Sequence, residues 1–306
     1  MILEFSPELD KQSVYAHGDE LASVLALDRD ADGNRIYSHD TNSTRHVADI
    51  ANPVLVTDSY KITSTLPGTV RDTVFTLYSS PLRVTKYDGL ELGFIQNQYP
   101  GVWGPSIDTL LFCKALRMMK LDGVKSAVEI GAGSGFISKY VLHKYPNVEE
   151  VALVDINPAA KICWEENLKS DKARFHIQNG QEFLADRTTD LLMCNPPYIP
   201  RPKSIDDNPY EGIGLLVHLI QNAKKFLNPG GTLLTNFSSL SRDIVEPEVA
   251  KRGLTIETIA SMRVPLKVMN VLNNPEWMKY LEARGLKKEN QDGYDYWHTI
   301  EIVKIR

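Results

Sequence analysis

An amide, two adjacent prolines and an aromatic ring follow an apolar run in the six residues Asn195, Pro196, Pro197, Tyr198, Ile199 and Pro200. Because proline has no backbone N–H, two consecutive prolines end the hydrogen-bond ladder of a strand. Pro197 also holds Pro196 extended, so the Pro196 carbonyl can point into a cleft beside the Asn195 side-chain oxygen. Two acceptors and the Tyr198 ring suit a planar amine or amide, which would donate its N–H groups and stack its face. Such a run on its own is usually only a turn after a buried strand.

A second candidate site is a glycine-rich turn with the pattern E-x-G-x-G-x-G, formed by Glu129, Gly131, Gly133 and Gly135. Glycines allow a tight turn whose backbone amides approach a ligand at a helix N-terminus. A dinucleotide fingerprint would require glycine at position 136, where the chain has phenylalanine. Asp155 ends the next predicted strand, 22 residues after Gly133, where an acidic group meets the hydroxyls of a ribose. These features predict an adenosine-containing ligand rather than a merely structural turn.

Alternating strands and helices must position both segments. Strands are predicted at 127–130, 151–154, 174–177, 191–194 and 232–236, and helices at 136–144, 159–169, 213–226 and 242–251. Two closing strands are predicted at 254–259 and 297–303. Strands separated by helices of this length form βαβ units. The predicted fold class is therefore α/β, a doubly wound Rossmann-like sheet of seven strands.

Two further segments flank this sheet. Before the glycine turn, a buried helix is predicted to end near Met119, with Ser106 as its N-cap and Asp108 in its first turn. Between the closing strands lies an insertion that contains Pro265, a predicted helix at 275–284 and a charged loop. An insertion of this size at a sheet edge is expected to be a lid or a substrate-recognition element.

The sequence pattern predicts two domains, a β-rich domain at residues 1–100 and a second domain at residues 101–306. Strands at 82–87 and 90–94 predict a hairpin around Asp88-Gly89. Asp28, Asp30, Asp32 and Gly33 resemble the start of a calcium loop, but the position of its bidentate glutamate falls on a histidine. A hairpin turn is therefore favoured over calcium binding, and a strand is also predicted at 70–78.

Composition indicates a globular cytoplasmic protein. The 306 residues are 42% hydrophobic and 24% charged, and no apolar stretch approaches the roughly 20 residues of a membrane span. The N-terminus carries Glu4, Glu8 and Asp10, where a signal peptide would be basic. Cys113, Cys163 and Cys194 lie far apart in apolar surroundings, which predicts reduced core thiols rather than disulfides or a metal site.

The charge distribution does not indicate nucleic-acid binding. The net charge is −5, and residues 1–100 hold 8 basic against 14 acidic side chains. Residues 101–306 hold the remaining 26 basic and 25 acidic side chains, with no basic tail or block. A phosphate backbone would require clustered positive charge, although a local basic groove stays open.

The glycine turn, Asp155, the turn at 227–231 and the N-P-P-Y tetrad, in this order, resemble the class I S-adenosylmethionine-dependent methyltransferases. The tetrad followed by Ile199-Pro200 resembles those that methylate planar nitrogens, namely HemK-type glutamine methyltransferases and N6-adenine and N2-guanine enzymes. The segment P-S-I-D-T at 105–109 is similar to the P-R-P-D-T of the HemK type, without its arginine. The resemblance covers 101–306, and residues 1–100 lack the helical pattern of the HemK-type substrate domain.

The resemblance implies S-adenosyl-L-methionine as cofactor and assigns roles to residues. Cofactor-binding residues would be Glu129, Gly131, Gly133, Gly135, Asp155, Gly180, Gln181 and Asn195. The catalytic residues, which would hold the acceptor nitrogen and its plane, would be Asn195, Pro196 and Tyr198. The substrate-binding residues would be Asp108, Pro197 and Tyr198. No metal is implied.

We therefore predict an N-methyltransferase whose acceptor is a protein, in particular a glutamine side chain. The alternatives are a nucleobase methyltransferase acting on an adenine or guanine amine, a small-molecule amine methyltransferase, and a non-enzymatic cofactor-binding scaffold. A scaffold would have no need of Asn195 and Tyr198. Trp103, near the predicted cleft, could stack on a substrate or cover the core, and the core is favoured. No membrane partner is expected, and the oligomeric state is left open.

Overall fold

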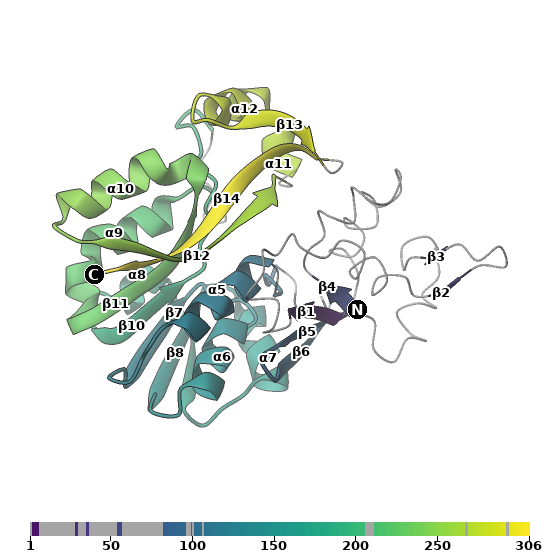
Figure 1. Cartoon of the computed structure of the whole chain (residues 1–306). Helices are drawn as coiled ribbons and strands as arrows, with labels where there is room; N and C mark the ends of the chain where they lie inside the picture. The colour runs from purple at the N-terminus through teal and green to yellow at the C-terminus, as the bar shows by residue number, and fades with distance from the viewer. Residues whose placement is uncertain are drawn as a thin grey trace.

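A computed structural model of the chain (Figure 1) describes residues 2–5, 28–29, 35–36, 54–56, 82–95, 99, 101–105, 107–205, 211–266, 269–291 and 294–306. Its largest sheet has eight strands in the order β12-β14-β11-β10-β7-β8-β9, with β13 paired to β14. The bounds are Ser126–Ile130 for β7, Glu150–Asp155 for β8, Ala173–Ile177 for β9, Thr189–Cys194 for β10, Leu227–Ser238 for β11, Ile256–Pro265 for β12, Lys287–Gln291 for β13 and Tyr294–Ile305 for β14.

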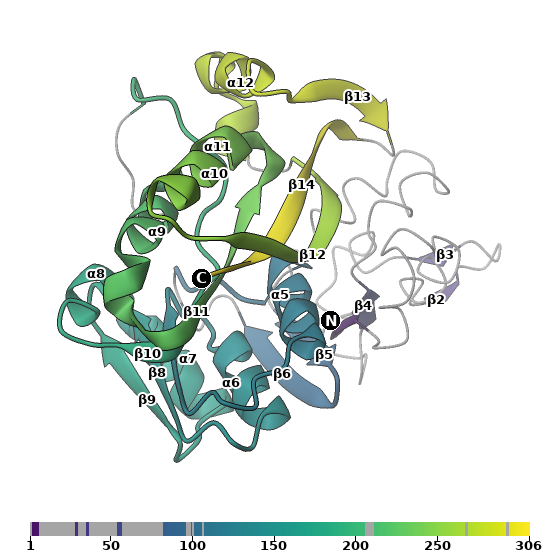
Figure 2. The same ribbon diagram turned by 60° about the vertical axis from the view of Figure 1, so that its left-hand side comes forward.

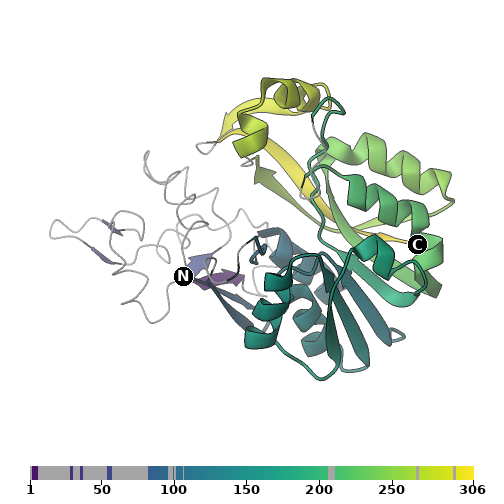
Figure 3. The same cartoon turned by 180° about the vertical axis from the view of Figure 1, so that it is seen from behind.

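Helices cover both faces of this sheet, as Figures 1 and 3 show. One apolar core packs α5 to α7 against the sheet, and a second packs α8 to α10 against its other face. The bounds are Ile107–Met118 for α5, Phe136–Lys144 for α6, Pro158–Asn167 for α7, Gly180–Phe183 for α8, Gly214–Phe226 for α9, Ser239–Ser241 for the 3-10 helix η3, Arg242–Lys251 for α10, Met269–Leu272 for α11 and Pro275–Glu282 for α12. The doubly wound α/β prediction is confirmed, with β13 as an eighth strand beside the seven predicted.

Parallel pairing brings the candidate segments to one edge of the sheet. Strand β7 pairs in parallel with β8 and β10, and its last residue, Ile130, lies opposite Val154 and Cys194. Asp155 lies opposite Ile177 at the end of β9. The residues that follow these strands therefore share the carboxyl edge, where open α/β sheets bind ligands.

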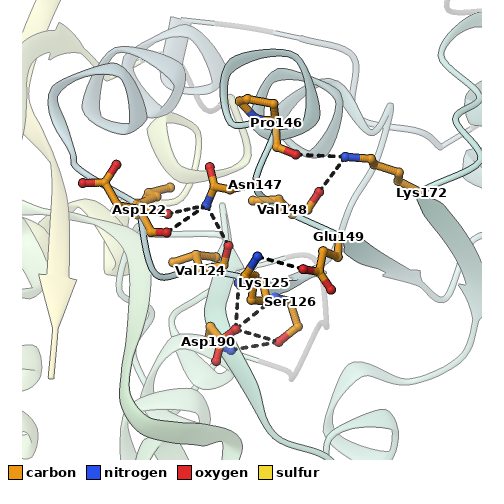
Figure 4. A network of polar contacts seen from close by, with 11 residues as sticks. Asp122, Val124, Lys125, Ser126, Pro146, Asn147, Val148, Glu149, Lys172 and Asp190 are labelled. Atoms are coloured by element: carbon orange, nitrogen blue, oxygen red, sulfur yellow. Dashed lines mark hydrogen bonds and ion pairs between the residues drawn. The ribbon is translucent and has the colours of Figure 1, made fainter.

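A polar network fixes the opposite edge, where the parallel strands begin (Figure 4). The Asp190 carboxylate accepts from the backbone amides of Lys125 at 2.9 Å and Ser126 at 3.0 Å, and from Asn228 Nδ2 at 2.7 Å. Burial opposes ionisation of Asp190, but these hydrogen bonds prevail and lower its pKa. The network ties the starts of β7 and β10 together.

The N-terminal part contributes a four-stranded sheet in the order β4-β1-β5-β6. Its bounds are Ile2–Phe5 for β1, Val54–Val56 for β4, Leu82–Tyr87 for β5 and Leu90–Ile95 for β6. The predicted hairpin around Asp88-Gly89 is confirmed, with φ of 48° and 83° at the two turn residues. Tyr140 Oη of α6 donates to Asp88 Oδ2 at 2.8 Å, so the hairpin docks on that helix (Figure 2).

Other N-terminal predictions are only partly covered. The two-residue strands Asp28–Arg29 (β2) and Arg35–Ile36 (β3) pair antiparallel, but Asp30, Asp32, Gly33 and the predicted strand at 70–78 lie outside the described residues. The proposed N-cap Ser106 does so too. The division of the chain near residue 100 stays a prediction.

The insertion between the closing strands differs from its prediction. The predicted charged loop is wrong, because Lys287–Gln291 forms β13 on β14, and Pro265 ends β12. The predicted helix is confirmed as α12. The insertion and the segment after β10 together form a small apolar core, the insertion core. It consists of Ile199, Leu240, Leu266, Val271, Trp277, Met278, Leu281 and Leu286.

All three cysteines are buried and unbridged, as predicted. Within the described part of the chain, no helix has both the length and the apolar character needed to cross a membrane.

Candidate active site

The glycine turn leaves β7 with an unusual backbone. Gly133 and Gly135 have φ of 52° and 77°, which side chains with a Cβ rarely adopt. A Cβ at Gly135 would also lie 2.5 Å from Trp164 Cε3, and one at Gly133 would lie 2.9 Å from the Trp103 carbonyl oxygen. At Gly131 a Cβ would meet no atom within 4 Å, so the turn is open on that side.

Asp155 braces this turn. Its Oδ2 accepts from the Gly133 backbone amide at 2.9 Å, and its Oδ1 accepts from the Asn157 amide at 2.9 Å. Each carboxylate oxygen has two lone pairs and so retains one for a further donor. Asp155 is half-buried at the sheet edge. It can therefore hold the turn in shape and still accept hydrogen bonds from ribose hydroxyls.

Glu129, predicted to bind the cofactor, is 2% exposed and turned toward α6. It accepts from the Ser138 backbone amide at 3.0 Å and from Ser138 Oγ. Burial raises the pKa of Glu129 to about 8, although the Ser138 hydrogen bonds oppose the rise. Its carboxyl group is thus engaged inside the protein, and its predicted role at the cofactor stays a prediction.

The start of α8, which follows β9, lies against the last residue of β7, the strand that leads into the glycine turn. Asn179 caps α8 by accepting from the Gln181 amide at 2.9 Å. A Cβ at Gly180 would collide with Ile130 Cγ2, so only glycine allows this close approach. Gln181 is exposed. The predicted adenine-side segment is therefore beside the turn.

Asn195 has its side chain oriented by α5. Its Nδ2 donates to Asp108 Oδ2 at 3.3 Å, and Asp108 is 5% exposed. Because a carboxylate only accepts, this contact settles which end of the amide faces Asp108. Asn195 Oδ1 is buried and makes no hydrogen bond with any described residue. Pro196 is buried beside it and Pro197 is half-buried.

Tyr198 is half-buried and packs between the α5-side core and the insertion core. Its ring centroid lies 6.0 Å from that of His298 on β14. His298 Nδ1 lies 2.9 Å from Ser238 Oγ. Burial lowers the pKa of His298 to about 4, against an opposing hydrogen bond with the Thr299 backbone. A neutral histidine therefore supports the Tyr198 ring at neutral pH.

Helix α12 holds the end of the same segment. Trp277 Nε1 donates to the Pro200 carbonyl at 2.8 Å. Both groups are buried, so this hydrogen bond and the insertion core fix the course of the chain after Tyr198. The insertion thus packs directly on the predicted acceptor segment.

Trp103 does not cover the core, and that prediction is wrong. Its side chain is 72% exposed while its carbonyl oxygen approaches Gly133. The segment around Trp103 is neither helix nor strand, so no periodic pattern in the sequence could predict whether its side chain is buried. Trp103 therefore lies exposed beside the glycine turn.

Sequence reasoning missed four residues near Asn195 and Tyr198, namely Asn236, Ser238, Trp277 and His298. Asn236 and Ser238 stand at the carboxyl end of β11, a place where ligands bind in such sheets. Their position at a strand end was the sequence feature that could have identified them. Trp277 and His298 come from distant parts of the chain, and no sequence feature links them to the site.

The glycine turn fits a cofactor with an adenosine group. It is open at Gly131, braced by a carboxylate with spare lone pairs, and followed by the N-terminus of α6. With Asn195 one strand away on a sheet of this order, the fold and site define a class I S-adenosylmethionine-dependent methyltransferase.

Comparisons with known proteins narrow this class. Residues 105–241 match the methyltransferase small domain. Human methyltransferase HEMK2 is 30% identical over 198 residues, which are 62% of this chain and 81% of that protein. A release factor glutamine methyltransferase of Geobacter sulfurreducens is 29% identical over 152 residues, 44% of this chain and 52% of that protein. The chain thus spans about half of the latter's length.

The chain belongs to the HemK-type family of S-adenosylmethionine-dependent methyltransferases. Among solved structures, the M. jannaschii tRNA m1G37 methyltransferase superposes with a TM-score of 0.47 at 15% identity, covering 73% of this chain and 56% of that one.

Proposed function

We propose that this methyltransferase acts on the planar nitrogen of a glutamine side chain in a protein. The observation that carries the proposal is the orientation of Asn195. Asp108 holds the Nδ2 end of the amide, and a buried Oδ1 is left as an acceptor next to Tyr198. An amide nitrogen brings the N–H donors and the flat face that this arrangement would bind.

The site residues would act by alignment. S-adenosylmethionine supplies an electrophilic methyl group on its sulfonium. Asn195 Oδ1 and the Pro196 carbonyl would accept the two N–H groups of the acceptor, and the Tyr198 ring would hold its plane. These contacts favour a pyramidal nitrogen and stabilise the positive charge that develops on it. One N–H proton then leaves to solvent, since methylation makes it acidic, and no strong base is required.

The cofactor would be held by the glycine turn and Asp155. Gly131 and Gly133 would lie beneath its methionine and ribose parts, and Asp155 would accept from its ribose hydroxyls. Gly180 and Gln181 would approach the adenine. The Asp155 contact with the Gly133 amide supports this division, because the same carboxylate shapes the turn and faces the edge.

Charge and kinship favour a protein acceptor. Residues 101–306 hold 26 basic and 25 acidic side chains without a basic block, which gives little general attraction for a phosphate backbone. The Geobacter relative is named for its action on glutamine in a release factor.

A labelling experiment tests the proposal. The protein is incubated with methyl-labelled cofactor and either a cell lysate or a purified translation release factor. We expect label that protease removes and nuclease does not. Label lost to nuclease alone would contradict the proposal and favour a nucleobase acceptor.

A variant tests the role of Asn195 in the same assay. Asn195→Ala should lower kcat by about 100-fold or more, as loss of a transition-state hydrogen bond does, and should lower cofactor affinity far less. Asn222→Ala is the matched control, because that amide only donates to the His218 carbonyl within α9. An unchanged kcat in Asn195→Ala would remove Asn195 from the mechanism.

A further inference from the structure

Asn236 is a second amide beside Asn195, on the neighbouring strand. The ladder between β10 and β11 ends at the pair Cys194 and Thr235, so Asn195 and Asn236 follow side by side. Met193 and Leu234 belong to the core on the α5 face, while Cys194 belongs to the core on the other face. Because side chains alternate along strands, both amides project toward the α5 face.

Asn236 is fully buried, yet it makes no side-chain hydrogen bond with any described residue. Neither its Oδ1 nor its Nδ2 has a partner. Buried amides in proteins are normally paired, so an amide with both ends unpaired calls for an explanation. Asn195 Oδ1, also buried and without a hydrogen bond to the described residues, lies beside it. Two acceptors and one donor are thus gathered at the proposed acceptor site.

We propose that Asn236 selects a primary carboxamide as the methyl acceptor by pairing with it amide to amide. Asn236 Nδ2 donates to the carbonyl oxygen of the substrate amide. One N–H of the substrate amide donates to both Asn236 Oδ1 and the Pro196 carbonyl. Asn195 Oδ1 accepts the other N–H. This inference rests on the proposed function and adds a donor for the carbonyl oxygen of the substrate amide, since Asn195 directs Oδ1 to the substrate while Asp108 holds the Nδ2 end of its amide.

Burial distinguishes this acceptor from a purine amine. Asn236 has no exposed surface, and Asn195 Oδ1 is also beneath the surface. Tyr198 and the insertion core are packed around the segment, so an acceptor must displace part of this packing. A side-chain carboxamide on a slender methylene stem would displace less of it than a bicyclic base.

Asn236→Leu, Asn236→Asp and Thr235→Val test the proposal. Thr235 is the matched control, because its Oγ1 is equally buried and without a hydrogen bond to the described residues, one residue away. By alternation it faces the other side of the sheet. Methyl transfer is measured on a pool of glutamine-containing peptides, and cofactor affinity is measured by calorimetry.

We expect Asn236→Leu to lower kcat/KM for the peptides by about 100-fold or more, because a site built to pair an amide loses both contacts. Cofactor affinity and Tm should not fall. Asn236→Asp, which keeps the shape but replaces the NH2 group by an oxygen, should also be impaired, and the Tm of each variant reports whether its fold is retained. Thr235→Val should match the wild type.

A second measurement does not depend on turnover. Propionamide is titrated into the protein loaded with S-adenosylhomocysteine, and the side-chain NH2 signals of Asn236 are followed by NMR. We expect these signals to shift with propionamide and not with N,N-dimethylpropionamide. Signals that stay in place, or full activity of Asn236→Leu on the peptides, would overturn the proposal. Label transferred by the wild type only to nucleic acid would instead refute the proposed function.

Discussion

Asp108→Asn should remove the preference of the Asn195 amide for a single orientation. In the structure Asp108 Oδ2 can only accept, so Nδ2 of Asn195 must face it. An asparagine introduced at position 108 presents both a donor and an acceptor. The Asn195 amide could then turn by half a rotation and direct its NH2 group, instead of Oδ1, toward the substrate.

The expected magnitude follows from the two kinds of hydrogen bond. A hydrogen bond to a charged group contributes about 1.5–3 kcal/mol, and a neutral one contributes about 0.5–1.5 kcal/mol. In the variant this preference is lost, because an asparagine at position 108 can accept from Nδ2 or donate to Oδ1 of Asn195 at about the same free energy. We expect kcat to fall about twofold, because the two orientations are then about equally populated and only the one with Oδ1 facing the methyl acceptor is competent.

The assay is methyl transfer at saturating cofactor, with cofactor affinity measured separately. Asp190→Asn is the control, because Asp190, at the opposite edge of the sheet, also accepts from an asparagine, Asn228, at 2.7 Å. That variant should lose stability and keep kcat. If Asp108→Asn kept the full kcat of the wild type, the orientation argument would be refuted.

Three further predictions concern stability and the pH response. The folded protein keeps the Glu129 proton up to about pH 8, against an ordinary value of 4.5, so Glu129 destabilises the fold progressively as pH rises between these values; thermal scans should show the Tm of Glu129→Gln gaining on the wild type across that range, and a constant difference would contradict this. Trp277→Phe leaves the buried Pro200 carbonyl unpaired and should cost about 2 kcal/mol in denaturant unfolding, with kcat/KM for the acceptor reduced and cofactor affinity retained. Gly135→Ala combines a left-handed backbone with a methyl 2.5 Å from Trp164 Cε3 and should cost about 3 kcal/mol, with Asn222→Ala unaffected in the same denaturant series.

The fold was largely predictable because local signals agreed with the packing. The predicted helices at 136–144 and 242–251 coincide with α6 and α10, and the five predicted parallel strands lie within β7 to β11. The strand β13 was missed because Lys287–Gln291 consists of charged and amide residues. Only pairing with β14 makes this segment a strand, and pairing between distant segments leaves no local pattern.

The candidate site was predictable only where a motif named it. Asn195 and Asp155 followed from strand ends, and the structure puts Asp108 in contact with Asn195. The exposure of Trp103 and the hydrogen bonds of Glu129 depend on backbone geometry that no spacing encodes. His298 enters through an antiparallel strand near the end of the chain, so its contact with Tyr198 is a property of the topology.

The hydrogen bond from Trp277 to Pro200 couples the insertion to the segment 195–200, so the two would move together. A shift of α12 would be transmitted through Pro200 to Tyr198, with little change at the glycine turn, which follows a different strand, β7. Sequence changes in this insertion would therefore be expected to alter the choice of methyl acceptor while cofactor affinity is preserved, so a transplanted insertion should carry that choice with it.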